Sequence, residues 1–294
     1  MALSVPATED DARLGILLML GAWFLFSIVD TSAKWLALVG LPAMQLAFFR
    51  YAGHLVIALG LSIREGLGAE ALPKGKTWLL LSRAFLLVTA TLSNFYALNF
   101  LPLTVTSAIM FSTPVIVCFL SVAWLREQVG PWRWFAILLG FVGVLIVIQP
   151  FGEAFHPAML LCIYNAVALA LYSILTRQLA GIVSTETMQL YMGVIGTVAM
   201  APLAFWVWQT PTGILDWALL IGLGVFGWAG HQLLTTAHRF ATANTLMPFT
   251  YSFLIYLTIL SWLFFAHVPG LWTLFGALII MASGLIIWKR EQSA

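Results

Sequence analysis

The first apolar stretch of the chain carries four distinctive side chains on one face of a helix. Trp23, Ser27, Asp30 and Lys34 follow at spacings of four, three and four residues, and this period places side chains on a common helical face. A carboxylate and an ammonium group four residues apart can pair along a helix. A lone carboxylate can instead bind a cation or carry a proton. Asp30 is therefore a candidate for an ion pair, a gate or a coupling site.

The composition decides what kind of helix holds these charges. Of the 294 residues, 62% are hydrophobic and only 8% are charged, whereas soluble domains carry roughly 25% charged residues. The mean hydropathy is +1.00. The chain is therefore predicted to be an integral membrane protein. Its two cysteines lie in apolar runs, which indicates packing and not a disulfide framework or a metal site. The polar N-terminus lacks the basic region of a signal peptide, so the first helix is expected to remain.

Ten runs are long and apolar enough to be transmembrane helices, which need about 20 residues each. An all-α protein with ten transmembrane helices is therefore predicted. The expected spans are 14–37, 42–62, 77–98, 102–124, 132–149, 157–178, 187–208, 215–237, 242–265 and 270–288.

The basic residues set the expected orientation, because Lys and Arg accumulate in cytoplasmic loops. With both termini in the cytoplasm, ten of the thirteen Lys and Arg fall on that side and none in the outer loops. The other three, Lys34, Arg50 and Arg83, lie within helices. Arg83 is expected to extend its charge to the inner interface. The ten are Arg13, Arg64, Lys74, Lys76, Arg126, Arg133, Arg177, Arg239, Lys289 and Arg290.

The two halves of the chain can be aligned with each other. Residues 126–147 align with residues 266–287, matching a glycine, a tryptophan and a phenylalanine, and residues 29–37 resemble residues 172–180. Each unit, 1–150 and 151–294, holds five helices, and an odd number inverts the second copy. Inverted repeats are typical of secondary transporters, whose substrate site lies between the repeats near the membrane midplane.

The chain resembles the EamA-type branch of the drug/metabolite transporter superfamily. The resemblance rests on residues 97–116 with a mid-helix Pro114, on residues 124–147 with Glu127 before a glycine-rich helix, and on Lys34 and Arg177 at the ends of corresponding helices. The second repeat departs from this pattern, because His267 stands where Glu127 stands in the first.

The resemblance has implications for architecture and substrate. It implies that the first, third, fourth, sixth, eighth and ninth helices line a cavity, with the fifth and tenth outside it. The aromatic richness, 14% of the chain, is most similar to bacterial exporters of aromatic amino acids of the YddG type. A bacterial cytoplasmic membrane location follows from the same resemblance.

Polar and aromatic side chains at bilayer depth are costly and usually face the bundle interior. Amides, hydroxyls and carbonyls freed by proline can bind an ammonium group, and a histidine or an amide can bind a carboxylate. A zwitterionic amino acid is therefore the expected cargo, although each residue could instead serve helix packing. The candidate substrate-binding residues are Trp23, Ser27, Asn94, Ser107, Met110, Asn165, Tyr172, Trp228, His231, Gln232, Thr235, Pro248 and Tyr251.

Asp30 and Arg50 are expected at similar depth, about 10 Å and 12 Å below the outer helix ends at 1.5 Å per residue. Asp30 could pair with Lys34 or with Arg50, either as a structural ion pair or as an outer gate. Asp30 is also the only acidic residue within a predicted helix core. A carboxylate held by a base is a poor proton carrier, which disfavours a proton-coupled exporter of cationic drugs.

Other functions find less support. The sequence contains no phosphate-binding loop and no catalytic motif for hydrolysis, so no enzyme, cofactor or metal is expected, and the basic residues form no nucleic-acid stripe. The expected partners are the lipid bilayer and a small-molecule substrate, and the protein is expected to be a monomer. The alternatives are a proton-coupled drug or quaternary-ammonium transporter, a nucleotide-sugar-like transporter of the same fold, and a membrane-embedded transferase.

Overall fold

The computed structural model describes residues 9–64, 75–113, 115–117, 119–120, 131–149, 155–179, 182–241 and 246–291. These residues form helices joined by turns, with no strand among them. The elements are α1 (Glu9–Leu38), α2 (Ala43–Arg64), α3 (Thr77–Ala97), α4 (Leu103–Met110), α6 (Pro131–Ile148), α7 (Ala158–Leu179), α8 (Thr185–Trp206), α9 (Ile214–Phe240), the 3-10 helix η1 (Met247–Tyr251), α11 (Ser252–Phe265) and α12 (Leu271–Glu291).

Six of the described helices are long and apolar enough to cross a membrane, namely α1, α2, α3, α7, α8 and α9. Shorter apolar helices accompany them, including Trp134–Ile148, Phe249–Phe265 and Leu271–Ile286. In lipid, a helix satisfies its backbone hydrogen bonds within its own segment. The chain is therefore a multi-pass, all-helical membrane protein.

The sequence explains why α1 ends and α2 reverses direction. Gly40 adopts φ +92°, a conformation that glycine reaches without steric cost. Its N–H bonds to Ala37 O at 3.1 Å, and the N–H of Leu41 bonds to Leu36 O at 2.9 Å. This pair of bonds is a Schellman motif, which satisfies the last carbonyls of α1. Pro42 follows and starts the next helix.

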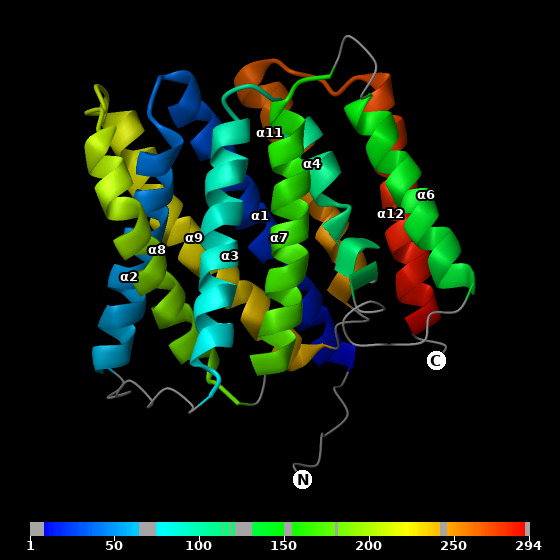
Figure 1. The fold of residues 1–294 in the computed structure, drawn as a ribbon, viewed down its shortest axis with the longest axis horizontal. Coiled ribbons are helices and arrows are strands. Elements are labelled where there is room, and N and C mark those ends of the chain that lie inside the picture. The colour runs from blue at the N-terminus through cyan, green and yellow to red at the C-terminus, as the bar shows by residue number, and fades with distance from the viewer. Residues whose placement is uncertain are drawn as a thin grey trace.

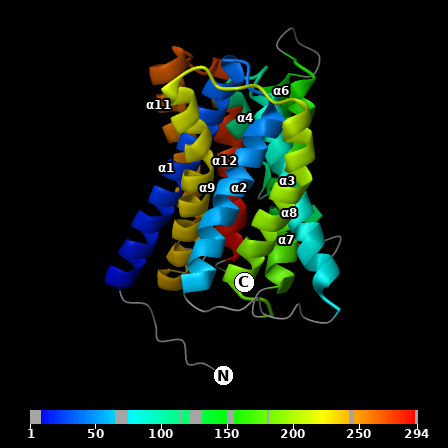
Figure 2. The ribbon, with the colours of Figure 1, turned by 90° about the vertical axis from the view of Figure 1, so that its left-hand side faces the viewer.

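The helices stand side by side along a common direction, and α1 begins at the same end of the bundle at which α12 ends (Figure 1). The most extensive contacts join α1 to α9, α6 to α12, α2 to α8 and α3 to α7, and α2 also packs along α9. The α6 and α12 pair occupies one edge of the bundle (Figure 1). A view from the opposite edge places α2 beside α9 and α8 (Figure 2).

Glycines allow two of these pairs to pack backbone against backbone. At the α2–α9 crossing, a Cβ on Gly224 would lie 2.6 Å from Gly53 Cα. At the α6–α12 crossing, a Cβ on Gly276 would lie 2.7 Å from Gly143 O. Small residues at helix contacts are typical of membrane bundles, because lipid offers no hydrophobic driving force and close packing must hold the helices together.

Two expected spans are irregular in the structure. The span 102–124 is interrupted after α4 by a turn at residues 111–112, and the span 242–265 begins as the 3-10 helix η1 before α11 continues. Pro248 lies in η1. Pro114 and the Glu127 segment lie outside the described residues. The two irregular helices, α4 and α11, also contact each other.

Candidate substrate site between the helices

A group of aromatic rings occupies the interior between α1, α9, α11 and the turn after α4. Trp23 lies 5.6 Å from Phe26 and 5.3 Å from Phe253 between ring centroids, and Phe253 lies 6.4 Å from Phe111. Tyr251 lies 5.3 Å from Phe111. These edge-on and tilted arrangements are the favoured geometries for aromatic pairs. Two of the predicted residues, Trp23 and Tyr251, thus belong to one aromatic group.

Buried nitrogens without partners lie in and beside this group. Trp23 Nε1, His54 Nε2 and His231 Nε2 have no hydrogen-bond partner among the described residues. The His231 ring lies 5.0 Å from Phe26 and 6.3 Å from His54. Most buried polar atoms in proteins are hydrogen-bonded, so three orphaned nitrogens on neighbouring rings are positions where a ligand could bond. His54 is not among the residues predicted from the sequence to bind substrate, and Gln189 Oε1, which is also buried without a described partner, lies near it.

The carboxylate of Asp30 contacts α3. Asn94 Nδ2 donates to Asp30 Oδ1 at 3.2 Å. The Lys34 ammonium group turns to the same neighbouring region, and Nζ donates to Leu98 O at 2.5 Å and Leu101 O at 3.0 Å. Lys34 therefore connects the C-terminal end of α1 to the turn between α3 and α4, and it bonds to the backbone there instead of to Asp30.

Arg50 lies between α2, α3 and α9. Its Nη1 donates to Thr91 Oγ1 at 3.3 Å, and its guanidinium carbon lies 5.7 Å from the Phe95 ring centroid. The position of a Cβ on Gly227 of α9 would be 3.5 Å from Arg50 Nε. Asp30 and Arg50 both contact α3, at Asn94 and Thr91, which are three residues apart on that helix. The two side chains therefore reach neighbouring turns of α3.

Arg83 has three hydrogen-bond acceptors in the described interior, whereas the sequence predicts its charge at the inner interface. Only 4% of its side-chain surface is exposed. Nη2 donates to Tyr172 Oη at 2.6 Å, Nε to Thr176 Oγ1 at 2.7 Å and Nη1 to Met188 O at 3.4 Å. The guanidinium also covers the Tyr172 ring at 4.4 Å. Arg83 thus joins α3 to α7 and α8. Because the guanidinium is buried away from water, its N–H groups bond to acceptors on these helices.

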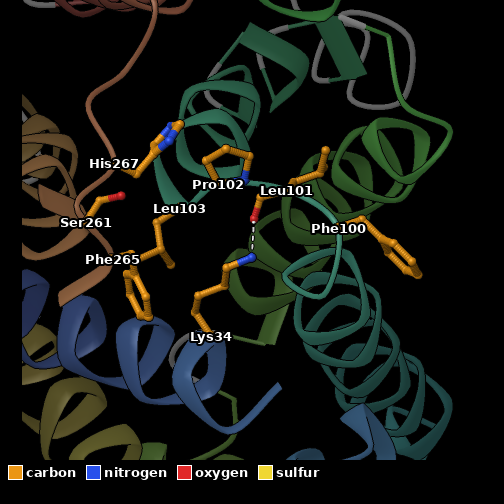
Figure 3. A pocket seen from close by; sticks show the side chains of 8 residues that line it. All are labelled: Lys34, Phe100, Leu101, Pro102, Leu103, Ser261, Phe265 and His267. Atoms are coloured by element: carbon orange, nitrogen blue, oxygen red, sulfur yellow. Dashed lines mark hydrogen bonds between the residues drawn. The ribbon is translucent and has the colours of Figure 1, made fainter. Parts of the chain in front are cut away.

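A pocket of about 220 Å³ lies beside Lys34, at the end of the bundle away from the chain termini (Figure 1). Figure 3 shows the Lys34 side chain reaching toward Leu101, with Ser261 and His267 across the pocket. Phe100 and Phe265 lie on its apolar walls. Sites for drug-sized ligands usually measure about 300–1,000 Å³, so this pocket suits a small polar group or part of a ligand.

The remaining predicted residues lie in less distinctive surroundings. Ser27, Ser107 and Thr235 donate to carbonyls of their own helices, those of Phe24, Thr104 and His231. Asn165 is buried on α7, Met110 and Trp228 are partly buried, and Gln232 is exposed on α9. For Pro248 the structure describes only the backbone, which lies in η1.

The fold defines the class of multi-pass helical membrane proteins, and the comparison with known families gives the particular family. The profile of the EamA-like transporter family matches residues 13–149 and again residues 156–289. The chain belongs to this family. Its members are transporters.

Several curated relatives extend over nearly the whole chain. The chain is 34% identical to a riboflavin transporter of Vibrio cholerae over 95% of each protein. It is 31% identical to an S-adenosylmethionine uptake transporter of Rickettsia bellii, over 92% of this chain and 94% of that protein. It is 28% identical to the pseudopaline exporter CntI of Pseudomonas aeruginosa, over 96% and 99%. These names do not include the aromatic amino acid exporters that the resemblance favoured.

A solved crystal structure has the same fold. It aligns with a TM-score of 0.66 over 98% of this chain and all of that chain, at 16% sequence identity. At that identity the likeness shows the fold alone.

Proposed function

We propose that the protein is a secondary transporter that moves a small aromatic metabolite across the bacterial cytoplasmic membrane, with riboflavin as the first candidate. The observation that carries this proposal is the set of orphaned nitrogens, Trp23 Nε1, His54 Nε2 and His231 Nε2, beside an interior group of aromatic rings. A planar heteroaromatic ligand offers both ring faces for stacking and edge atoms for hydrogen bonds. The 34% identity to a riboflavin transporter supports riboflavin among such ligands.

The transport cycle that we propose is alternating access between two inverted five-helix repeats, 1–150 and 151–294, within a ten-helix monomer whose termini are cytoplasmic. The family profile matches each half separately. An inverted repeat makes α1 equivalent to α7 and α3 equivalent to α9. The α1–α9 contact then corresponds to the α7–α3 contact, and both are among the most extensive in the bundle. The irregular helices α4 and α11 are also equivalent, and discontinuous helices commonly form transporter sites.

We assign Lys34 and Asp30 to the outer gate of this cycle. Lys34 ties α1 to the carbonyls of Leu98 and Leu101 at the outer end. Outward opening would break these bonds, and Asp30 lies close enough to replace them as a partner in the opened state, since it is one helical turn away.

A specific observation supports a second candidate, the export of amino acids. An acidic group, Asp30 of α1, and a basic group, Arg50 of α2, contact α3 on neighbouring turns, at Asn94 and Thr91. A zwitterion could place its ammonium group at Asp30 and its carboxylate at Arg50. Aromatic side chains of amino acids would then enter the ring group of Trp23 and Phe253.

The test is flux through the purified protein in liposomes, with labelled riboflavin and labelled tryptophan supplied separately. Trp23→Phe keeps an aromatic ring and removes the N–H, so it should raise the KM for riboflavin about tenfold if the indole donates to the ligand, because a hydrogen bond contributes about 1–1.5 kcal/mol. Trp206→Phe makes the same change at a side chain that is 89% exposed, and serves as the matched control.

The outcomes separate the candidates. Riboflavin flux that Trp23→Phe weakens and Trp206→Phe preserves supports the proposal. Tryptophan flux without riboflavin flux selects the second candidate. Flux of neither compound refutes both substrates.

A further inference from the structure

Two arginines lie inside the described bundle, and their surroundings differ. Arg83 has three hydrogen-bond acceptors and a stacked ring, so its guanidinium is saturated by α7 and α8. Arg50 has one acceptor among the described residues, Thr91 Oγ1, at the long distance of 3.3 Å. A guanidinium carries five N–H donors in a planar fork. Most N–H groups of the Arg50 guanidinium therefore have no acceptor among the described residues. Burying a donor without an acceptor costs free energy.

The nearby carboxylate does not use this fork. No pair of nitrogen and oxygen atoms within 4.0 Å joins Arg50 to Asp30 among the described residues, and Asp30 accepts instead from Asn94 at 3.2 Å. Each group has a hydrogen-bond partner on α3 instead, Asn94 for Asp30 and Thr91 for Arg50. The two groups therefore contact neighbouring turns of α3 without the direct contact that a structural Arg–carboxylate pair makes.

A chain of hydrogen bonds supports the one acceptor of the Arg50 fork. Tyr51 Oη donates to Leu87 O at 2.9 Å and lies 2.8 Å from Thr91 Oγ1, which accepts from Arg50. Tyr51 is itself pinned, because its ring lies against Gly196 of α8 with room for no side chain between them. The network bonds to one nitrogen of the guanidinium and leaves the other N–H groups available to a ligand. A binding group that is positioned in this way before the ligand arrives is preorganised.

We propose that Arg50 anchors the substrate through two adjacent acceptor atoms on the substrate's edge. This inference rests on the proposed function and names the chemistry of its site. Planar forks bind paired acceptors bidentately. Two sources share this chemistry. The pyrimidinedione edge of a flavin places a ring nitrogen beside a carbonyl oxygen, and an amino acid places two carboxylate oxygens together. Asp30 then accepts from a donor of the same ligand, a ribityl hydroxyl or an ammonium group.

The decisive variant is Arg50→Lys, because lysine keeps the positive charge and loses the planar fork. The protein in lipid nanodiscs is titrated with riboflavin, followed by flavin fluorescence, and separately with tryptophan, followed by calorimetry. Arg50→Lys should weaken binding of the recognised ligand at least about tenfold, the loss of one charged hydrogen bond. Val56→Ala, on the same helix at a side chain that is 70% exposed, should leave the affinity unchanged.

A second variant guards against misfolding of the first. Thr91→Val removes the acceptor that orients Arg50 and leaves the charge in place, so it should weaken binding several-fold. Thermal unfolding of each variant in nanodiscs confirms that it is folded before it is titrated.

Each outcome decides the proposal. Wild-type affinity for riboflavin or tryptophan in folded Arg50→Lys, or in Thr91→Val where Arg50→Lys does not fold, overturns the anchor and leaves the proposed function intact. Tryptophan binding that Arg50→Lys weakens, without riboflavin binding, refutes riboflavin and keeps the anchor. Binding of neither ligand to the wild-type protein overturns both.

Discussion

Replacing Gly224 by alanine tests whether the α2–α9 crossing sets the interior geometry. The new Cβ would lie 2.6 Å from Gly53 Cα and 3.0 Å from Phe49 O. These are backbone atoms, which cannot rotate away. Carbon atoms pack best at about 3.5–4.0 Å, so α2 and α9 must separate by about 1 Å. Overpacking of this kind costs about 1–3 kcal/mol, while alanine regains about 0.5–1 kcal/mol of backbone freedom.

The matched control is Gly60→Ala, on α2, where an added Cβ meets no atom within 4 Å. Gly60→Ala also reduces the backbone entropy lost on folding, but it introduces no clash. The two variants should therefore differ by about 1–3 kcal/mol in free energy of unfolding. Thermal and denaturant unfolding in nanodiscs measure the difference. Gly224→Ala should also weaken substrate binding, because Arg50 lies one turn from Gly53. Equal stability and equal affinity of the two variants would show that the crossing is more compliant than the close approach implies.

Three further predictions concern contacts between helices. Gln45→Ala removes two bonds to the backbone of Gln209, at 2.8 Å and 3.0 Å, and should lower the unfolding free energy by about 1–3 kcal/mol, measured by denaturant titration; an unchanged midpoint would contradict it. Tyr172→Phe keeps the ring under Arg83 and removes its 2.6 Å acceptor. It should destabilise by about 1–3 kcal/mol, and a melting temperature equal to that of the wild type would disprove it. Ser283→Ala breaks a single bond between α12 and α6, at 2.6 Å. Its loss should be only about 0.6 kcal/mol, so a shift several times larger in the same assay would refute this view.

Local features of the sequence predicted much of the helical framework. The apolar runs predicted the described spans, because in lipid each backbone polar group must bond within its own helix. The α1–α2 turn followed from Gly40 and Pro42. The 3-10 form of η1 did not follow, because a proline permits several local geometries and packing selects one.

The candidate site was less predictable, since its contacts join distant parts of the chain. Arg83 was expected at the interface, yet its partners lie 89 to 105 positions away in sequence. No local sequence pattern predicts such partners. Helical spacing placed Trp23 and Asp30 on one face of α1, but the rings that surround Trp23 come from α11 and from the turn after α4. The identity of the substrate depends on these contacts between helices, and the periodicity of one helix does not predict them.

The contacts of Arg83 have a kinetic consequence for the end of the bundle where the chain begins and ends. One guanidinium serves acceptors on both α7 and α8. If only α7 or only α8 moved away from α3, some N–H groups of Arg83 would lose their acceptors while the others stayed bonded to the helix that remained. Separation at this end is therefore expected as a single concerted event with a high barrier, and not as gradual fraying. Such a barrier gives each closed period a long and well-defined lifetime, which single-molecule recordings would register as two discrete levels.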